Sequence, residues 1–179
     1  MNLKRTILLA TALATTLLAG CASVPTLGDT AKMQAITEDA PKGTARIYIM
    51  RTNIRTAGAA LYKDLYLDGK CLGETAPGTF FIADVEGDKY HWISTESEFS
   101  PNHLRFYAEA DKKYYFQQVI RLGVFVGGAF LTQLDDLTGR ELVHTCSLAV
   151  PGTCSSAQVI KLPDDSEESL KERTESVEK

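Results

Sequence analysis

Hydrophobic and polar positions alternate with period two over several short runs of the chain from Ala45 onward. This alternation is typical of β-strands that bury one face. The runs expected to form strands are 45–50, 61–67, 70–74, 80–85, 89–95, 104–109 and 114–122. Because short strands recur with turn signals between them, the pattern predicts a mainly β domain, either an antiparallel β-sandwich or a small barrel.

Three connections between these runs carry signals of their own. Asp68-Gly69 predicts a hairpin, because a type I′ turn needs positive φ at both central positions. The runs 104–109 and 114–122 are separated by a short turn, so we expect them to pair antiparallel. The apolar stretch 124–134 contains Gly127 and Gly128, which indicates either a buried strand with a bulge or a loop followed by a strand.

One short helix is expected over about 137–144. Thr138 and Glu141 have the spacing of a capping box, although Gly139 lowers the helical propensity of the segment. Asp135 and Asp136 come directly before it. Their position favours capping or electrostatic roles over a pair of catalytic carboxylates.

The beginning of the chain has the pattern of an export signal. Lys4 and Arg5 precede an uncharged apolar run, Ile7 to Leu18. A bilayer-spanning helix needs about 20 apolar residues, so this shorter run predicts a signal peptide instead. The run ends in Leu18-Ala19-Gly20-Cys21, which resembles the lipobox of bacterial lipoproteins. The resemblance implies cleavage before Cys21, followed by acylation of its thiol and its freed amine.

The same resemblance implies a location. In the lipoprotein sorting rule, Asp after the cysteine favours retention in the inner membrane. Ala22 stands at that position here, which implies the outer membrane, on its periplasmic side. Two or three acyl chains hold a protein stably, whereas one chain holds it only marginally.

The chain is expected to contain a single globular domain. Residues 1–20 are the predicted signal peptide, and residues 21–43, rich in turn formers, are the lipidated N-terminus and a tether with at most a helical turn near 31–36. Residues 44–162 form the β-rich domain. Residues 163–179 are mostly charged and polar, which predicts a solvated acidic tail, disordered or transiently helical.

Charge excludes one class of partner. The formal net charge of the 179 residues is −4, and cleavage of the leader removes the positive Lys4 and Arg5. Binding to nucleic acid depends on clustered Lys and Arg, and no basic patch follows Arg5. We therefore expect no nucleic-acid partner.

Three cysteines remain after Cys21: Cys71, Cys146 and Cys154. An exported domain folds in an oxidising compartment, where disulfides form. We expect a Cys146–Cys154 bridge, because the loop between them contains Pro151 and Gly152. Pairing of Cys71 with either of the other two is the alternative. With the expected bridge, Cys71 remains as a buried thiol on its strand.

Residue patterns that carry chemistry are sparse. His144, Cys146 and Cys154 lack the second ligand pair of a structural zinc site, and His91 and His103 fit strand or loop positions. The sequence has no nucleophile elbow, phosphate loop or dinucleotide fingerprint. We therefore expect no catalytic residue, metal or cofactor. An aromatic set, explained mainly by core packing, is the other candidate for a ligand or partner face: Tyr62, Tyr66, Tyr90, Trp92, Tyr107 and Tyr115.

The stretch from Ala45 to about Leu148 resembles an uncharacterised bacterial lipoprotein family, the domain of unknown function number 2846. The resemblance is carried by 46–51, Leu65-Tyr66-Leu67-Asp68-Gly69-Lys70, 78–81, Ala108-Glu109-Ala110-Asp111-Lys112-Lys113-Tyr114-Tyr115 and 139–142. Residues 66–75 also resemble small envelope β-sandwich domains named after a Pro-Glu-Gly-Ala motif. Since 74–78 departs from that motif, this second likeness implies only the fold. Neither resemblance implies a reaction or a ligand.

Together these features predict a lipid-anchored envelope protein whose domain is structural or mediates interactions and is not an enzyme. Its expected partners are membrane lipid, through acylated Cys21, and an unidentified envelope protein. The alternative is a binding module for a glycan or a lipid. A glycan site needs exposed coplanar rings, and a lipid site needs a deep apolar cavity, for which the stretch 119–134 is the candidate.

Overall fold

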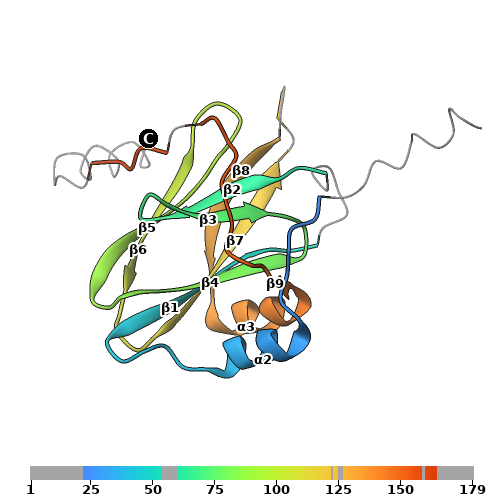
Figure 1. The fold of residues 1–179 in the computed structure, drawn as a ribbon. Coiled ribbons are helices and arrows are strands. Elements are labelled where there is room, and N and C mark those ends of the chain that lie inside the picture. The colour runs from blue at the N-terminus through green and yellow to red at the C-terminus, as the bar shows by residue number, and fades with distance from the viewer. Residues whose placement is uncertain (1–21, 54–59, 122, 125–126, 159, 165–179) are drawn as a thin grey trace, which may run out of the picture.

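Two β-sheets pack face to face in the computed structural model, which describes residues 22–53, 60–121, 123–124, 127–158 and 160–164 (Figure 1). One sheet has the strand order β8-β7-β1-β4-β9 and the other β3-β2-β5-β6. The elements are α2 (Asp29–Thr37), β1 (Thr44–Arg51), β2 (Lys63–Leu67), β3 (Lys70–Thr75), β4 (Thr79–Glu86), β5 (Lys89–Thr95), β6 (Asn102–Ala108), β7 (Lys113–Arg121), β8 (Gly128–Leu134), α3 (Asp136–Thr145) and β9 (Ser147–Leu148).

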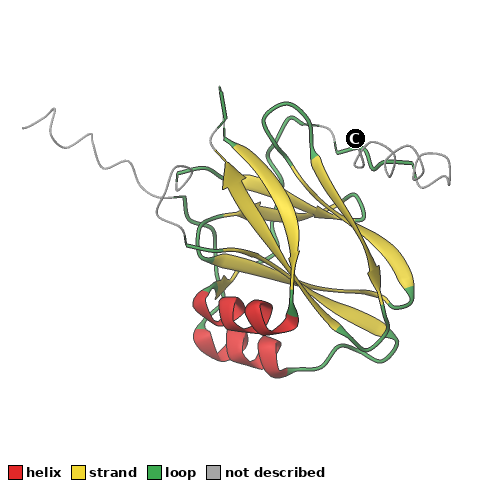
Figure 2. Cartoon of the chain, turned by 180° about the vertical axis from the view of Figure 1, so that it is seen from behind, coloured by secondary structure: helices red, strands yellow, loops and turns green. Residues whose placement is uncertain are grey.

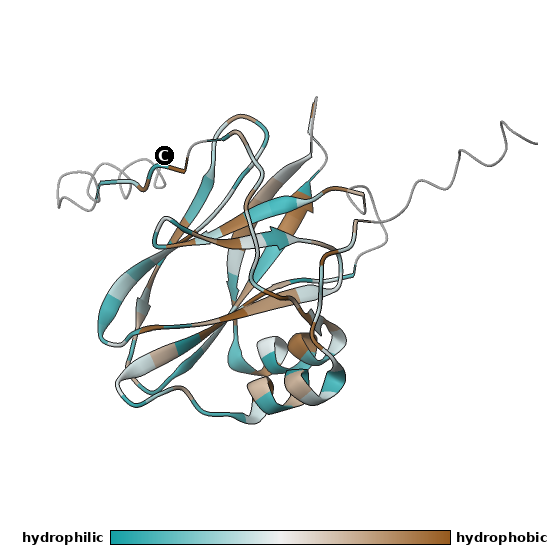
Figure 3. Cartoon of the chain, in the orientation of Figure 1, coloured by the Kyte–Doolittle hydropathy of each residue, from teal (hydrophilic) through white to brown (hydrophobic). Residues whose placement is uncertain are grey.

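The predicted mainly β fold is confirmed as a sandwich, since the sheets do not close into a barrel. Its pairing is mixed, because β1 runs parallel to β7 and β4 runs parallel to β9. Hydrophobic and hydrophilic positions are interleaved along the strands (Figure 3). Such alternation sets which face a strand buries, but it does not choose the neighbouring strand.

The expected antiparallel pair of 104–109 with 114–122 is wrong. The first run, β6, pairs with β5, whereas β7 pairs with β1 and β8. The turn between them is held beside the start of β1, where the Asp111 N–H donates to the Thr44 carbonyl at 2.7 Å and Asp111 Oδ1 accepts from Gly43 N at 2.9 Å. The chain therefore crosses from one sheet to the other at this turn.

The Asp68-Gly69 hairpin is confirmed, with φ of 50° at Asp68 and 74° at Gly69. Asp68 adopts this conformation with help from its carboxylate, which accepts hydrogen bonds from the neighbouring strand. Its Oδ1 accepts from Trp92 N at 2.9 Å, and its Oδ2 lies 2.7 Å from His91 Nδ1. In the stretch 124–134 the strand begins at Gly128, so the alternative of a loop followed by a strand is correct.

The core has two layers, one on each face of the five-stranded sheet. The first lies between the sheets, where Ile47, Ile49 and Phe116 meet Leu65 and Ile93. The second lies under the helices and consists of Tyr48, Met50, Phe80, Tyr115, Val143, Cys146 and Leu148. Because both faces of β1 are covered, seven of its eight residues are buried.

Helix α3 confirms the predicted C-terminal helix, although its cap is a different residue. Asp135, rather than Thr138, is the N-cap: Asp135 Oδ1 accepts from Thr138 N at 2.9 Å, and Asp135 Oδ2 accepts from the Thr138 hydroxyl at 2.7 Å. Gly139 lies against β7, and a Cβ there would be 2.2 Å from the Tyr115 ring. The glycine that lowers the propensity of the helix thus permits its close packing.

Residues 22–43 are not the expected tether, because the described segment lies on the domain. The Leu27 N–H donates to the Leu148 carbonyl at 2.8 Å, and the Val150 N–H donates to the Pro25 carbonyl at 2.9 Å. Helix α2 follows, longer than the expected turn, and lies beside α3 (Figure 2). Lys32 Nζ joins the helices by donating to the His144 carbonyl at 2.7 Å.

Candidate functional site at the loop end of the sandwich

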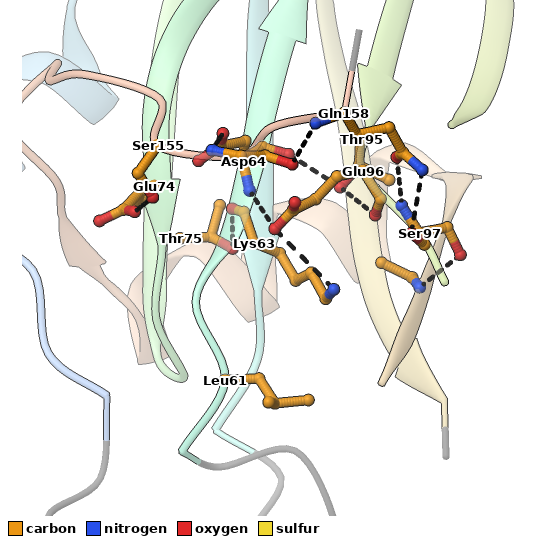
Figure 4. Close-up of polar contacts among 12 residues, drawn as sticks. Leu61, Lys63, Asp64, Glu74, Thr75, Thr95, Glu96, Ser97, Ser155 and Gln158 are labelled. Atoms are coloured by element: carbon orange, nitrogen blue, oxygen red, sulfur yellow. Dashed lines mark hydrogen bonds and ion pairs between the residues drawn. The ribbon is translucent and has the colours of Figure 1, made fainter. Parts of the chain in front are cut away.

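Strands β1, β3, β5 and β7 all finish at the same end of the sandwich, which lies away from the start of α3 (Figure 1). We call this the loop end and define it by the described residues 60–62, 96–101, 123–124 and 127, from the β1–β2, β5–β6 and β7–β8 connections. Buried polar side chains gather directly beneath it (Figure 4). This juxtaposition of buried polar groups and loops makes the loop end the candidate functional site.

Gln118 is the centre of the buried network and joins the two sheets. Its Oε1 lies 2.6 Å from the hydroxyl of Thr75 on β3, and its Nε2 donates to the hydroxyl of Thr95 on β5 at 2.7 Å. Thr95 in turn donates to the Asp64 carbonyl at 2.9 Å. The Thr75 hydroxyl also lies 2.9 Å from the Lys63 carbonyl, and its single hydrogen serves one of these two acceptors at a time.

Two basic side chains lie beside this network. Arg51 Nη1 donates to the Leu61 carbonyl at 2.7 Å and to the Thr75 carbonyl at 3.1 Å. Burial lowers the pKa of Arg51 to about 10. Lys63 Nζ lies 3.8 Å from Glu96 Oε1, which also accepts from the Asp64 N–H at 3.3 Å. The Arg51 contacts hold the β1–β2 connection at Leu61, and the Glu96 contacts join the start of β2 to the start of the β5–β6 connection.

Asp64 is a buried carboxylate on the other face of β2. Its Oδ2 accepts from Ser156 N at 2.7 Å and from the Tyr66 hydroxyl at 3.2 Å. Burial is the main reason that the pKa of Asp64 is raised. Because the residue is only 1% exposed, it is a stabilising acceptor for the C-terminal segment and is screened from solvent substrates.

The C-terminal segment 150–164, here called the strap, crosses the outer face of the four-stranded sheet in front of β3 and β2 (Figure 1). Its Gly152 N–H donates to the Leu72 carbonyl at 3.0 Å. The Gln158 side chain of the strap bonds to both backbone groups of Ser97: its Oε1 accepts from Ser97 N at 2.9 Å, and its Nε2 donates to the Ser97 carbonyl at 3.2 Å. Ser155 contacts Glu74. The strap therefore fixes the base of the β5–β6 connection.

A disulfide joins the strap to β3, and it is Cys71–Cys154 rather than the expected Cys146–Cys154. The expectation is wrong because β9 begins directly after Cys146 and pairs with β4 in extended form. This extended run carries Cys154 away to β3 before the chain turns. Cys146 is the buried free thiol, and burial raises its pKa. The alternative pairing of Cys71 with Cys154 is therefore the correct one.

The loop end also exposes apolar side chains. Val124 is 79% exposed, Phe99 75% and Tyr62 43%. Their connections touch: a Cβ at Gly127 would lie 2.2 Å from Leu61 Cδ1, and Ser97 Oγ accepts from Ala129 N at 3.1 Å. Phe99 and Val124 are not in the aromatic set expected from the sequence. Val124 lies in the stretch 119–134 expected as a candidate lipid site, whereas the only sequence signal of Phe99 is an apolar residue among turn formers.

Residues 41–129 match the family described as Protein of unknown function (DUF2846). An uncharacterized protein of Haemophilus influenzae (strain ATCC 51907 / DSM 11121 / KW20 / Rd) is 41% identical over 138 residues, which cover 75% of this chain and 79% of the relative. The chain belongs to the DUF2846 family. No solved structure matches it.

The DUF2846 match confirms the resemblance drawn from the sequence. It runs from just before β1 to Ala129 in β8, so it includes the Gln118 network and all three exposed apolar residues of the loop end. Helix α3, β9 and the strap lie beyond the matched range. The network and the loop end therefore belong to the matched part of the fold, whereas Cys154 does not.

The other residues singled out in this DUF2846 sequence are dispersed. His91 bonds to Asp68, and His103 Nδ1 lies 2.7 Å from Ser94 Oγ. Asp136 pairs with Arg140 at 2.8 Å, at the end opposite the loops. In the described ranges no three His, Cys, Asp or Glu residues cluster as metal ligands. No helix of the described residues is long and apolar enough to cross a membrane.

The predicted aromatic set does not form one face either. Tyr66 bonds to Asp64, Trp92 is buried and meets the His103 ring edge to face, and Tyr115 lies under α3. Tyr90 and Tyr107 share an exposed surface, with ring planes at 67° and the Arg105 guanidinium 3.6 Å above the Tyr90 ring. Cys21 and the lipobox residues Leu18, Ala19 and Gly20 lie outside the described residues.

Proposed function

We propose that this DUF2846 protein is a lipid-anchored lipoprotein of the cell envelope, held by acylated Cys21 on the periplasmic side of the outer membrane. Its sandwich serves as a structural or interaction domain for an envelope protein and carries out no reaction. The observation that carries the proposal is the junction at Cys21. The sequence there has the pattern of a signal peptide ending in a lipobox, and the residue that follows Cys21, Ala22, is only 7% exposed and so belongs to the domain.

One further observation supports the proposal. The Cys71–Cys154 disulfide suits an oxidising compartment, as is expected of an exported protein.

A non-enzymatic role is supported by how the polar side chains are used. Gln118, Asp64 and Arg51 bond to other groups of the protein and are buried, whereas catalytic groups converge on an open cleft. The glycan alternative is not proposed, because Tyr90 and Tyr107 meet edge to face rather than forming a coplanar platform.

The test is metabolic labelling with palmitate followed by fractionation of the envelope. Wild type should carry the label and float with outer membranes. Cys21→Ser should be unlabelled and keep its leader, because no thiol remains to be acylated. Cys146→Ala is the control and should label as wild type does. An unlabelled wild type, or a labelled Cys21→Ser variant, overturns the anchor. Crosslinking in native envelopes then identifies the protein partner.

A further inference from the structure

We infer that the loop end rests on the lipid bilayer that holds acylated Cys21, with Phe99 and Val124 in contact with the lipid. The domain then lies on the membrane in one orientation instead of moving freely on a tether. The inference rests on the proposed function, because acylation of Cys21 supplies the bilayer.

The first argument is the concentration of exposed apolar groups. Val124 and Phe99 are the two most exposed of the large hydrophobic residues in the described chain, and both belong to the loop end. Scattered exposed apolar residues are ordinary, but a contiguous group marks a site of protein or membrane contact. Here the connections that carry them are neighbours, joined through Leu61 and Gly127 and through Ser97 and Ala129.

The second argument is that these connections are held in place. Ser97, two residues before Phe99, is bonded through both its N–H and its carbonyl to Gln158 of the strap. Ser97 Oγ also accepts from the backbone of β8. A surface that inserts apolar side chains gains most when little conformational freedom is lost on contact. The strap therefore supports the loop end as a preformed contact surface.

The third argument is the place where the chain leaves the fold. Ser23 N lies 3.2 Å from the Tyr62 hydroxyl oxygen, and that hydroxyl donates to the Ser23 carbonyl at 3.2 Å. Tyr62 belongs to the loop end. Cys21 is two residues before Ser23, and two extended residues span at most about 7 Å. The acyl chains therefore start beside the loop end, which makes the bilayer the occupant of this surface in preference to a protein.

The opposite end of the molecule exposes one of the large apolar side chains, Leu137, but beside it the surface is charged. A hollow there is lined by charged residues only: Asp39, Asp111, Lys112, Lys113, Asp136 and Arg140. Charged groups are costly to remove from water, so this end faces the periplasm in the inferred orientation.

The test places tryptophan at exposed positions of the full acylated protein, reconstituted into phosphatidylcholine vesicles whose acyl chains carry bromine as a quencher. Phe99→Trp and Val124→Trp report on the loop end. Leu137→Trp is the matched control, because Leu137 is 70% exposed on α3 at the far end. The native Trp92 is buried and gives the same background in every variant.

In the Phe99→Trp and Val124→Trp variants, the fluorescence above the Trp92 background should fall by roughly half in brominated vesicles compared with plain ones. The reason is that interfacial side chains reach about 5–10 Å into the bilayer boundary. Trp at 137 should emit as it does in plain vesicles. Adding Val124→Asp to the Phe99→Trp protein should reduce the quenching, whereas adding Leu137→Asp should not.

If the bromine quenches tryptophan to the same extent at all three positions, the orientation is overturned. The anchor is unaffected by that result, since flotation and palmitate labelling report it separately. Absence of palmitate on Cys21 overturns the proposed function and the orientation together. Strong quenching at 137 with none at 99 and 124 shows that the opposite end faces the lipid and likewise overturns the inference.

Discussion

Cys71 on β3 and Cys154 in the strap, 83 residues apart in the sequence, form a disulfide with their Cα atoms 6.0 Å apart. The bond closes a chain segment that contains strands β4 to β9 and helix α3. It also fixes the strap beside Asp64, which is where Ser156 N donates to the carboxylate. The disulfide thus adds a covalent link to a junction that also has a backbone hydrogen bond, from the Gly152 N–H of the strap to the Leu72 carbonyl of β3.

Replacing both cysteines, Cys71→Ser with Cys154→Ser, should lower the free energy of unfolding by about 2–4 kcal/mol, because the unfolded chain regains the freedom of a long loop. Urea denaturation measures the loss. Cys146→Ala is the control and should cost only about 1 kcal/mol, as expected for a small change in a packed core. Peptide mapping without reductant should link Cys71 to Cys154, and a linked Cys146 would contradict the pairing.

The partner of Cys154 could not be read from the local sequence, because it depends on how two distant segments pair. Residues 147–150 lie between β4 on one side and residues 25–27 on the other. Turn formers in 147–153 suggested a closed loop, but extended pairing on both sides overrode that preference. The same interaction made the supposed tether part of the domain. Both errors have one cause, a long-range pairing without a local signal.

Gly139→Ala should destabilise the protein by about 1–3 kcal/mol, as overpacking typically does, even though Ala is the better helix former. The new Cβ would lie 2.2–2.7 Å from atoms of Tyr115. Tyr115 is on β7, which is paired with β1 on one side and β8 on the other and therefore cannot shift easily. Gly28→Ala is the matched control, because no atom lies within 4 Å of a Cβ there. Thermal unfolding of both variants measures the difference. Equal midpoints would show that α3 does not pack closely on β7.

Sequence patterns predicted correctly those features that depend on residues close together in the chain. Asp68-Gly69 predicted a type I′ turn because the two positive φ angles are a property of two residues. Period two located β1 and β7, because alternate side chains of each strand enter the apolar core between the sheets, as Ile47, Ile49 and Phe116 do. The loop end was predicted only in part: Val124 lies in the stretch 119–134 expected as a candidate lipid site, whereas Phe99 is far from it in the sequence, and their connections become neighbours only on folding.

Gln118→Leu should cost about 1–3 kcal/mol, because the Thr75 and Thr95 hydroxyls lose a buried partner. Gln117→Leu is the control on the other face of β7, where the Gln117 amide donates to Thr52 Oγ1 from a half-buried position, and it should cost less. Replacing all three members, with Val at both threonines, should recover much of the loss. A triple variant that is weaker than Gln118→Leu would contradict this account of the network.

The last prediction concerns alkaline pH and Tyr48, whose ring is fully buried and stacks on Tyr115 with centroids 4.9 Å apart. Burial is the main reason that the pKa of Tyr48 is raised to about 12. In the unfolded chain a tyrosine ionises near pH 10. The folded state therefore binds this proton more tightly, and the resulting stability is complete below pH 10 and is lost as the pH rises through 12. A displacement of this size corresponds to about 2–3 kcal/mol.

Tyr48→Phe should remove this part of the alkaline loss while changing little at neutral pH, since the hydroxyl makes only a long hydrogen bond to the Ile36 carbonyl, 3.4 Å. Urea midpoints between pH 8 and 12 measure it, with both proteins in the Cys146→Ala background, because a free thiolate exchanges with the disulfide at high pH. Tyr66→Phe is a useful comparison, since burial also raises the pKa of Tyr66 to about 12 at the surface of the other sheet. If wild type and Tyr48→Phe lose stability in parallel above pH 10, ionisation of Tyr48 is not coupled to unfolding, and the tight packing of its ring under α3 would have to be reconsidered.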